Sequence, residues 1–349
     1  MREDALKRAY GVPLIAEYRG SLLENLHCGH ICVVDEHNRI SACVGNPQHV
    51  TYMRSSAKPI QALAFLSMGL DIQYGLNDQE LTLIAGSHQG GEYHVDALCE
   101  IARKMDIKEE QLVLLPTPPA DAEFRDAAVA AGRKPRKFYH NCAGKHLATI
   151  AMARALGQSD KTYYQSGTPV QEYLLSFLAR IVGLSVKEIV LGVDGCGVPV
   201  YGLPLFAMAQ VYLLLACPDL LNDENLKKAV IQLDRIMHEN PQYINKENYI
   251  CTCMNLDPNV FAKGGAQGIY CFALKKQRLG IAFKIMDGSE KEWQLVIYEI
   301  MRQLGVSDSV AMNQMVRLRP FEIINATGSR VGQYEPVFHL AAPISFLVS

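Results

Sequence analysis

The sequence lacks the features that mark a nucleic-acid-binding protein. Lys and Arg are scattered among Asp and Glu, and the formal net charge is −2, so no basic face is predicted. The densest basic stretch, Arg133-Lys134-Pro135-Arg136-Lys137, is short and is predicted to be a surface loop. These observations exclude nucleic acid as an expected partner.

The sequence also shows no apolar leader. Its start, Met1-Arg2-Glu3-Asp4, is charged and leads into no apolar core of signal length, so we expect no standard secretion and a cytoplasmic location. Ten cysteines in such a chain indicate reduced thiols, some of which can serve as metal ligands, rather than a disulfide framework.

One segment has the length of a membrane span. No charged residue occurs from Gly195 to Pro218, which is enough on paper to cross a bilayer. Pro199, Gly202 and Pro204 interrupt its first third, however, and leave residues 205–216 as a helix of core length. We therefore expect a buried central helix and no membrane partner.

The hydrophobic pattern predicts a mixed chain of strands and helices. Alternating and β-branched runs predict an N-terminal antiparallel meander at residues 14–17, 29–35 and 40–44. Helices are predicted at 78–84, 95–105, 121–131, 146–155, 168–182, 226–239 and 292–305, with further strands at 186–193, 268–274 and 280–286. Neither a repeat nor a long linker is visible. We predict a single α/β (α+β) catalytic domain over residues 1–349, with an antiparallel or mixed sheet and a helix-rich lobe packed closely together.

Ser55 and Lys58 are the first candidates for chemistry. A serine hydroxyl is a weak nucleophile until a base takes its proton, and a neutral lysine one helical turn away can be that base. Pro59 suits the first turn of a helix that continues to Gly69, so Ser55 is predicted at a helix N-terminus, where free N–H groups favour a developing alkoxide. The structural alternative is an ordinary capped helix start.

Other polar clusters allow more than one interpretation. His27-Cys28-Gly29-His30-Ile31-Cys32 contains metal-binding residue types, but alternate residues of a strand face opposite sides, so a strand with buried thiols is the better interpretation. Ser87-His88 cannot act as a serine–histidine pair because adjacent side chains point apart. The Gly-flanked stretches 141–146 and 194–197 lie at predicted element ends, where loops can direct side chains into a cleft.

Five ordered motifs resemble those of the class 3 L-asparaginases, the Ser-Lys type. They are Arg54-Ser55-Ser56-Ala57-Lys58-Pro59-Ile60-Gln61-Ala62, Ser87-His88-Gln89-Gly90, Asn141-Cys142-Ala143-Gly144-Lys145-His146, Gly192-Val193-Asp194-Gly195-Cys196-Gly197-Val198-Pro199 and Ala262-Lys263-Gly264-Gly265-Ala266-Gln267-Gly268. Glu24-Asn25-Leu26-His27-Cys28-Gly29 and Asp287-Gly288-Ser289 extend the resemblance over nearly the whole chain. It implies a fold related to serine β-lactamases and glutaminases.

The resemblance also implies roles for particular residues. Ser55 with Lys58 and Ser87 with Lys263 are similar to two catalytic Ser-Lys pairs, Cys142, Lys145 and Cys196 to zinc ligands, and Arg54, His146 and Asp194 to residues that hold the charged α-groups of the substrate. The implied reaction is hydrolysis of L-asparagine to L-aspartate and ammonia through a seryl acyl-enzyme. The zinc would order the site, and we expect a homodimer.

The chain departs from the family pattern at several positions. Gly90-Gly91-Glu92 replaces Gly-Glu-Pro, Ala143 replaces serine, Gln267 replaces glutamate, and Ile250-Cys251-Thr252 stands where an Asp-Thr pair is expected. These positions lie near the predicted pocket, so the motifs define the reaction type better than the substrate.

Three other functions were weighed against this one. A penicillin-recognising or esterase-type Ser-x-x-Lys acyl hydrolase is disfavoured because Ser-Asp-Asn and Lys-Thr-Gly motifs are lacking. A threonine-nucleophile asparaginase is disfavoured because Thr-Gly-Gly-Thr is lacking. A non-enzymatic zinc-bearing binding protein on the same fold is the third alternative.

Overall fold

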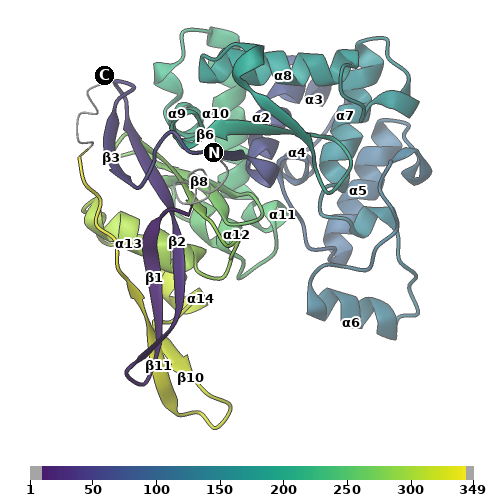
Figure 1. The fold of residues 1–349 in the computed structure, drawn as a ribbon. Helices are drawn as coiled ribbons and strands as arrows, with labels where there is room; N and C mark the ends of the chain where they lie inside the picture. Colours follow the sequence, from purple (N-terminus) through teal and green to yellow (C-terminus); the bar gives the residue numbers. More distant parts are fainter. Residues whose placement is uncertain (1–9, 343–349) are drawn as a thin grey trace, which may run out of the picture. The chain divides into compact units, whose positions relative to one another are not determined.

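The computed structural model describes residues 10–342, which divide into two compact units (Figure 1). Unit 1 comprises residues 10–56, 203–220 and 253–342, and unit 2 comprises residues 57–202 and 221–252. The start Met1-Arg2-Glu3-Asp4, on which the expectation about a leader depends, lies outside the described residues.

Unit 1 is built on an antiparallel sheet. Within residues 10–342 the sheet has eight strands in the order β10-β11-β1-β2-β9-β8-β7, and β3 pairs with β2 beside this path. The strands are β1 (Val12–Arg19), β2 (Leu22–Asp35), β3 (Ile40–Val44), β7 (Val260–Gly264), β8 (Ile269–Leu274), β9 (Leu279–Ile285), β10 (Glu322–Ile324) and β11 (Arg330–Pro336). The predicted antiparallel meander is confirmed, and the stretch 27–32 lies within β2 as expected.

One buried helix covers the centre of this sheet. Helix α9 (Leu205–Ala216) packs against β2, β8 and β9, and its bounds match the predicted core helix. The helix lies very close to β9, because a Cβ atom at Gly280 would come within 2.0 Å of the Ala209 carbonyl oxygen. In the described part of the chain, no helix has both the length and the apolar character that a membrane crossing requires.

The remaining elements of unit 1 are two helices after β9, one short strand and one short helix. Helices α13 (Trp293–Gln303) and α14 (Val310–Leu318) pack together, and α13 also contacts β1 and β11. Strand β4 (Val50–Tyr52) precedes the turn that carries Ser55, and α12 (Ile250–Asn255) spans the change from unit 2 to unit 1 in the sequence.

Unit 2 is a helical assembly with one small hairpin. Its helices are α2 (Lys58–Ser67), α3 (Leu70–Tyr74), α4 (Asp78–Ala85), α5 (Glu92–Lys104), α6 (Ala122–Ala130), α7 (Ala143–Ala155), α8 (Pro169–Val182), α10 (Glu224–Glu239) and α11 (Pro241–Ile244). The hairpin joins β5 (Val190–Val193) to β6 (Pro199–Pro204). Helix α4 is central, since it contacts α2, α5, α7, α10 and α11. The fold class expected from the sequence, an antiparallel sheet with a helix-rich part, is thus confirmed.

Several predicted elements have other bounds in the structure: strand β2 begins at Leu22 rather than at residue 29, and helix α5 begins at Glu92 rather than at residue 95. The predicted strand 186–193 begins with a 3-10 turn at Val186–Glu188, because the Glu188 carboxylate accepts the Ser185 backbone N–H at 2.8 Å and caps a helical turn. Helix α7 begins at Ala143, three residues earlier than predicted, so that Lys145 lies inside its first turn.

Candidate functional site

Lys58, at the start of α2, has a buried amine surrounded by oxygen atoms. Only 1% of the residue is exposed. Its Nζ lies 2.8 Å from the Gly86 carbonyl oxygen, 2.8 Å from the Asn141 carbonyl oxygen and 2.9 Å from Ser87 Oγ. The sequence had paired Lys58 with Ser55, whereas this contact joins it to the other candidate serine.

These three contacts fit an ammonium, which donates to all three oxygens, and they also fit a neutral amine. A carbonyl oxygen can only accept a hydrogen bond, whereas a hydroxyl can also donate one. A neutral amine has two N–H groups and one lone pair, so Lys58 can donate to Gly86 and Asn141 and accept the hydroxyl proton of Ser87. The arrangement can therefore activate Ser87 as a nucleophile.

Main-chain contacts fix the backbone around Ser87. Helix α4 ends at Ala85, and the Ser87 N–H donates to the Ile244 carbonyl oxygen at 2.6 Å. Gly86 permits this approach, because a Cβ atom there would come within 2.5 Å of the Tyr243 carbonyl oxygen. The position of the serine thus depends on main-chain contacts.

Two neighbouring histidines are neutral. Burial lowers the pKa of His88 well below its usual value and lowers the pKa of His94 to about 4. His94 Nδ1 accepts the Gly91 N–H at 3.2 Å, and Nε2 lies 3.0 Å from the Gln242 carbonyl oxygen, to which a neutral ring donates. His88 Nδ1 accepts the Gly90 N–H, which leaves the proton on Nε2.

The start of α7 carries two of the residues with implied metal-binding roles, since Cys142 is its N-cap residue and Lys145 lies in its first turn. Lys145 Nζ lies 3.1 Å from Cys196 Sγ and 3.7 Å from Asp194 Oδ2. A hydrogen bond from Cys196 lowers the pKa of the Cys142 thiol well below its usual range, and the charges of Lys58 and Lys145 act in the same direction. Burial disfavours the Lys145 ammonium, but the interactions with Cys142, Cys196 and Asp194 outweigh it and raise the Lys145 pKa. The hydrogen bond to Cys142 and burial raise the pKa of the Cys196 thiol itself.

This cluster fits a metal in part. Within residues 10–342, no group of three or more His, Cys, Asp or Glu side chains is arranged to hold a metal ion. The Cys142–Lys145–Cys196 set has two thiols and one amine. A tetrahedral zinc with thiolate and nitrogen ligands separates the two donor atoms by about 3.5 Å, close to the 3.1 Å between Lys145 Nζ and Cys196 Sγ. The spacing is near that of two zinc ligands, but the contact is also a hydrogen bond, and Lys145 would have to lose its proton to ligate the metal.

The elements that carry the cluster approach each other closely. A Cβ atom at Gly144 would come within 2.8 Å of the Leu83 carbonyl oxygen, so glycine allows the start of α7 to lie on α4. Asp194 and Cys196 occupy the tight turn between β5 and β6, where the Asp194 N–H donates to the Val198 carbonyl oxygen at 2.8 Å. Gly197 has a φ of 87°, which favours glycine.

His146 is held by a residue that the sequence did not indicate. Its Nδ1 lies 2.6 Å from Tyr163 Oη, which itself accepts the Val113 N–H at 3.0 Å. The tyrosine hydroxyl can donate its proton to Nδ1, and in that tautomer the ring proton lies on Nε2. Burial lowers the pKa of His146 well below its usual value, so the ring offers a neutral N–H rather than a positive charge.

Unit 1 carries the remaining predicted residues. Arg54 opens the 3-10 turn Arg54–Ala57 with a φ of 53°, a conformation that is uncommon outside glycine. Lys263 lies on β7 and is buried, and its Nζ donates to the Gly264 carbonyl oxygen at 2.7 Å. Tyr212 Oη lies 2.8 Å from the Ser56 carbonyl oxygen and 3.3 Å from that of Lys263. The turn that contains Ser55 and the end of β7 are thus linked through a tyrosine.

Comparison with known proteins gives the family. The sequence profile of L-asparaginase II matches residues 15–336. The chain belongs to the L-asparaginase II family. This match confirms the family resemblance drawn from the motifs, and it identifies the protein as an amidohydrolase of this family.

Other comparisons are more distant. The structure of Mglu in its native form has 14% identity and a TM-score of 0.44, with 90% of this chain and 69% of that chain covered. A β-lactamase structure from Mycobacterium bovis has 13% identity and a TM-score of 0.40, with 88% and 100% covered. A search among curated proteins found no match.

The buried histidine His94 predicts how stability depends on pH. Its pKa is about 4 in the folded protein and about 6.5 in an unfolded chain. The contribution of His94 to the free energy of unfolding is therefore complete above pH 6.5 and is lost as the pH falls to 4. We expect the His94→Gln variant to lose less unfolding free energy than the wild type between these pH values. Urea denaturation at each pH measures this difference, and parallel pH profiles would contradict it.

Proposed function

We propose that this protein hydrolyses L-asparagine to L-aspartate and ammonia, with Ser87 as the nucleophile and Lys58 as its base. The observation that carries the proposal is the 2.9 Å contact between Lys58 Nζ and Ser87 Oγ, in an amine whose other near neighbours include two carbonyl oxygens. Membership of the L-asparaginase II family supports the choice of substrate.

The reaction follows from this pair. Ser87 Oγ attacks the side-chain amide carbon while its proton passes to Lys58. The tetrahedral intermediate collapses when Lys58 returns the proton to the departing nitrogen, which leaves as ammonia. Water then attacks the seryl ester while Lys58 accepts a proton from it, and Lys58 returns this proton to Ser87 Oγ as the ester bond breaks and aspartate is released.

Asp194 and His146 are proposed to recognise the α-groups of the substrate. The Asp194 carboxylate can accept hydrogen bonds from the α-ammonium, and the neutral Nε2–H of His146 can donate to the α-carboxylate. Arg54, Ser55 and Lys263 keep the roles that the family resemblance implies for them as predictions.

We further propose that Cys142, Lys145 and Cys196 hold zinc. The cation would supply positive charge beside the two thiolates. That charge matters for Lys58, because the Cys142 thiolate and the Lys58 amine interact electrostatically, and an unbalanced thiolate would favour the protonated lysine. Balancing the thiolate would leave Lys58 able to act as a base.

The catalytic pair predicts the behaviour of two variants. Ser87→Ala and Lys58→Met should each lower kcat for ammonia release from asparagine by at least about a thousandfold, since the two groups act as one unit. Ser67→Ala, at the end of α2, is the matched control and should retain activity. Assays with asparagine, glutamine and β-aspartyl dipeptides would define the substrate. Ser87→Ala protein that keeps more than a tenth of the activity would refute the assignment.

The metal proposal predicts a composition. Protein purified without a metal-binding tag should contain zinc near one equivalent by elemental analysis, and Cys196→Ser should lose it together with part of its thermal stability. Cys217→Ser removes a buried thiol of unit 1 and should leave the zinc content unchanged. Equal zinc in both variants, or zinc-free wild type, would show that the cluster is not a metal site.

A further inference from the structure

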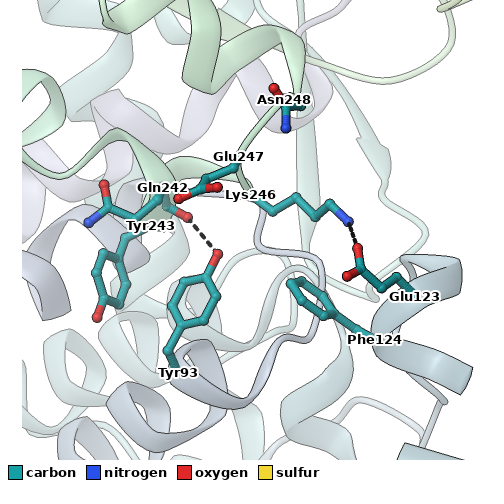
Figure 2. A pocket seen from close by; sticks show the side chains of 8 residues that line it. All are labelled: Tyr93, Glu123, Phe124, Gln242, Tyr243, Lys246, Glu247 and Asn248. Carbon is teal, nitrogen blue, oxygen red and sulfur yellow. Dashed lines mark hydrogen bonds and ion pairs between the residues drawn. The ribbon is translucent and has the colours of Figure 1, made fainter. Parts of the chain in front are cut away.

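Unit 2 contains a cavity of about 610 Å³ that the proposed reaction does not use. Its wall includes the rings of Tyr93, Phe124 and Tyr243 and the charged side chains of Glu123, Lys246 and Glu247. Figure 2 shows Tyr93 and Phe124 on one side of the cavity and the segment with Lys246 and Glu247 on the other.

The charges of the cavity wall do not balance. Lys246 Nζ pairs with Asp121 Oδ1 at 2.9 Å and with Glu123 Oε2 at 3.1 Å, so its positive charge is already neutralised. Among residues 10–342, the exposed carboxylate of Glu247 has no hydrogen-bond or ion-pair partner. The wall therefore retains an excess of negative charge.

The aromatic rings, like the excess negative charge, favour a cationic ligand. Tyr93 and Phe124 meet edge to face, with ring centroids 6.2 Å apart and planes at 83°, and Tyr93 meets Tyr243 at 88°. The faces of aromatic rings are electron-rich and attract cations. The protein itself uses this attraction, since Lys246 Nζ lies 4.7 Å from the centroid of Phe124.

We propose that this cavity binds a small molecule that carries an organic ammonium group. The rings of Tyr93 and Phe124 would contact the cation, and Glu247 would be its counter-ion. An anionic ligand would face Glu247 and would have to displace two carboxylates from Lys246.

The proposal does not depend on the amidohydrolase reaction. The cavity wall is continuous with the segment that fixes the nucleophile, because Gln242 and Ile244 accept hydrogen bonds from His94 and Ser87. Because the cavity and the nucleophile share this segment, binding to the cavity is best measured directly on the intact protein, without substrate.

The test compares choline with its neutral isostere 3,3-dimethyl-1-butanol in a ligand-observed NMR titration. Choline should bind saturably and at least about fivefold more tightly than the isostere, because shape is shared and only the charge differs. Equal affinities, or no saturable choline binding at millimolar concentrations, would overturn the proposal.

Variants establish the location and the sign of the site. Glu247→Gln should weaken choline binding by about two- to fivefold, whereas Glu172→Gln, an exposed glutamate on α8, should leave it unchanged. Lys246→Met should strengthen choline binding because it uncovers the ring of Phe124 and frees the carboxylates of Asp121 and Glu123. Weaker choline binding in Lys246→Met, or acetate binding to the wild type that this variant abolishes, would contradict a cation site. Circular dichroism would confirm that each variant is folded.

Discussion

An amine buried as deeply as that of Lys58 needs a hydrogen-bond partner in each direction, because an unpartnered polar group in the interior costs several kcal/mol. The structure provides these partners from the end of α4 and from the residue before Cys142. The start of α2, the end of α4 and the start of α7 must therefore converge on one atom. Gly86 and Gly144 make this convergence sterically feasible, since a Cβ atom at either position would meet a backbone carbonyl.

The same convergence links the Lys58 amine to the thiol cluster. Asn141 accepts a hydrogen bond from Lys58, and the next residue, Cys142, belongs to the thiol cluster with Lys145 and Cys196. A buried lysine beside a thiolate is drawn toward its protonated form, whereas a base must be neutral. The proposed zinc would resolve this conflict by balancing the thiolate charge. Bound there, the metal would tune the base and order the loop, and the serine would make the attack.

The sequence was most informative where hydrophobic pattern and local capping agree. Helix α9 was predicted with its observed bounds because prolines and glycines limit an uncharged segment. Strands β10 and β11 were missed because their residues are half-buried or exposed and leave no apolar periodicity. The early start of α7 was missed because no side chain caps it, and the residue after Ala143 is a glycine.

For the candidate site too, the sequence predicted some features and missed others. The motifs supplied Lys58, Ser87, Cys142, Lys145 and Cys196, but sequence spacing paired Lys58 with Ser55 rather than with Ser87. The contacts that fix Ser87 come from backbone carbonyls of distant segments, and residue types do not predict such main-chain contacts. Tyr163 and Tyr212 were also missed, because a tyrosine that orients another residue through its hydroxyl resembles any core tyrosine in the sequence.

The central claim is that Lys58 activates Ser87 for attack on the amide carbon, and the acyl-enzyme tests it most directly. Rapid acid quenching during turnover of asparagine, followed by peptide mass mapping, shows which serine carries the aspartyl ester. The account predicts the added mass on the peptide that contains Ser87, and its absence from that peptide in Lys58→Met protein. An aspartyl ester on Ser55, with Ser87 unmodified, would contradict it.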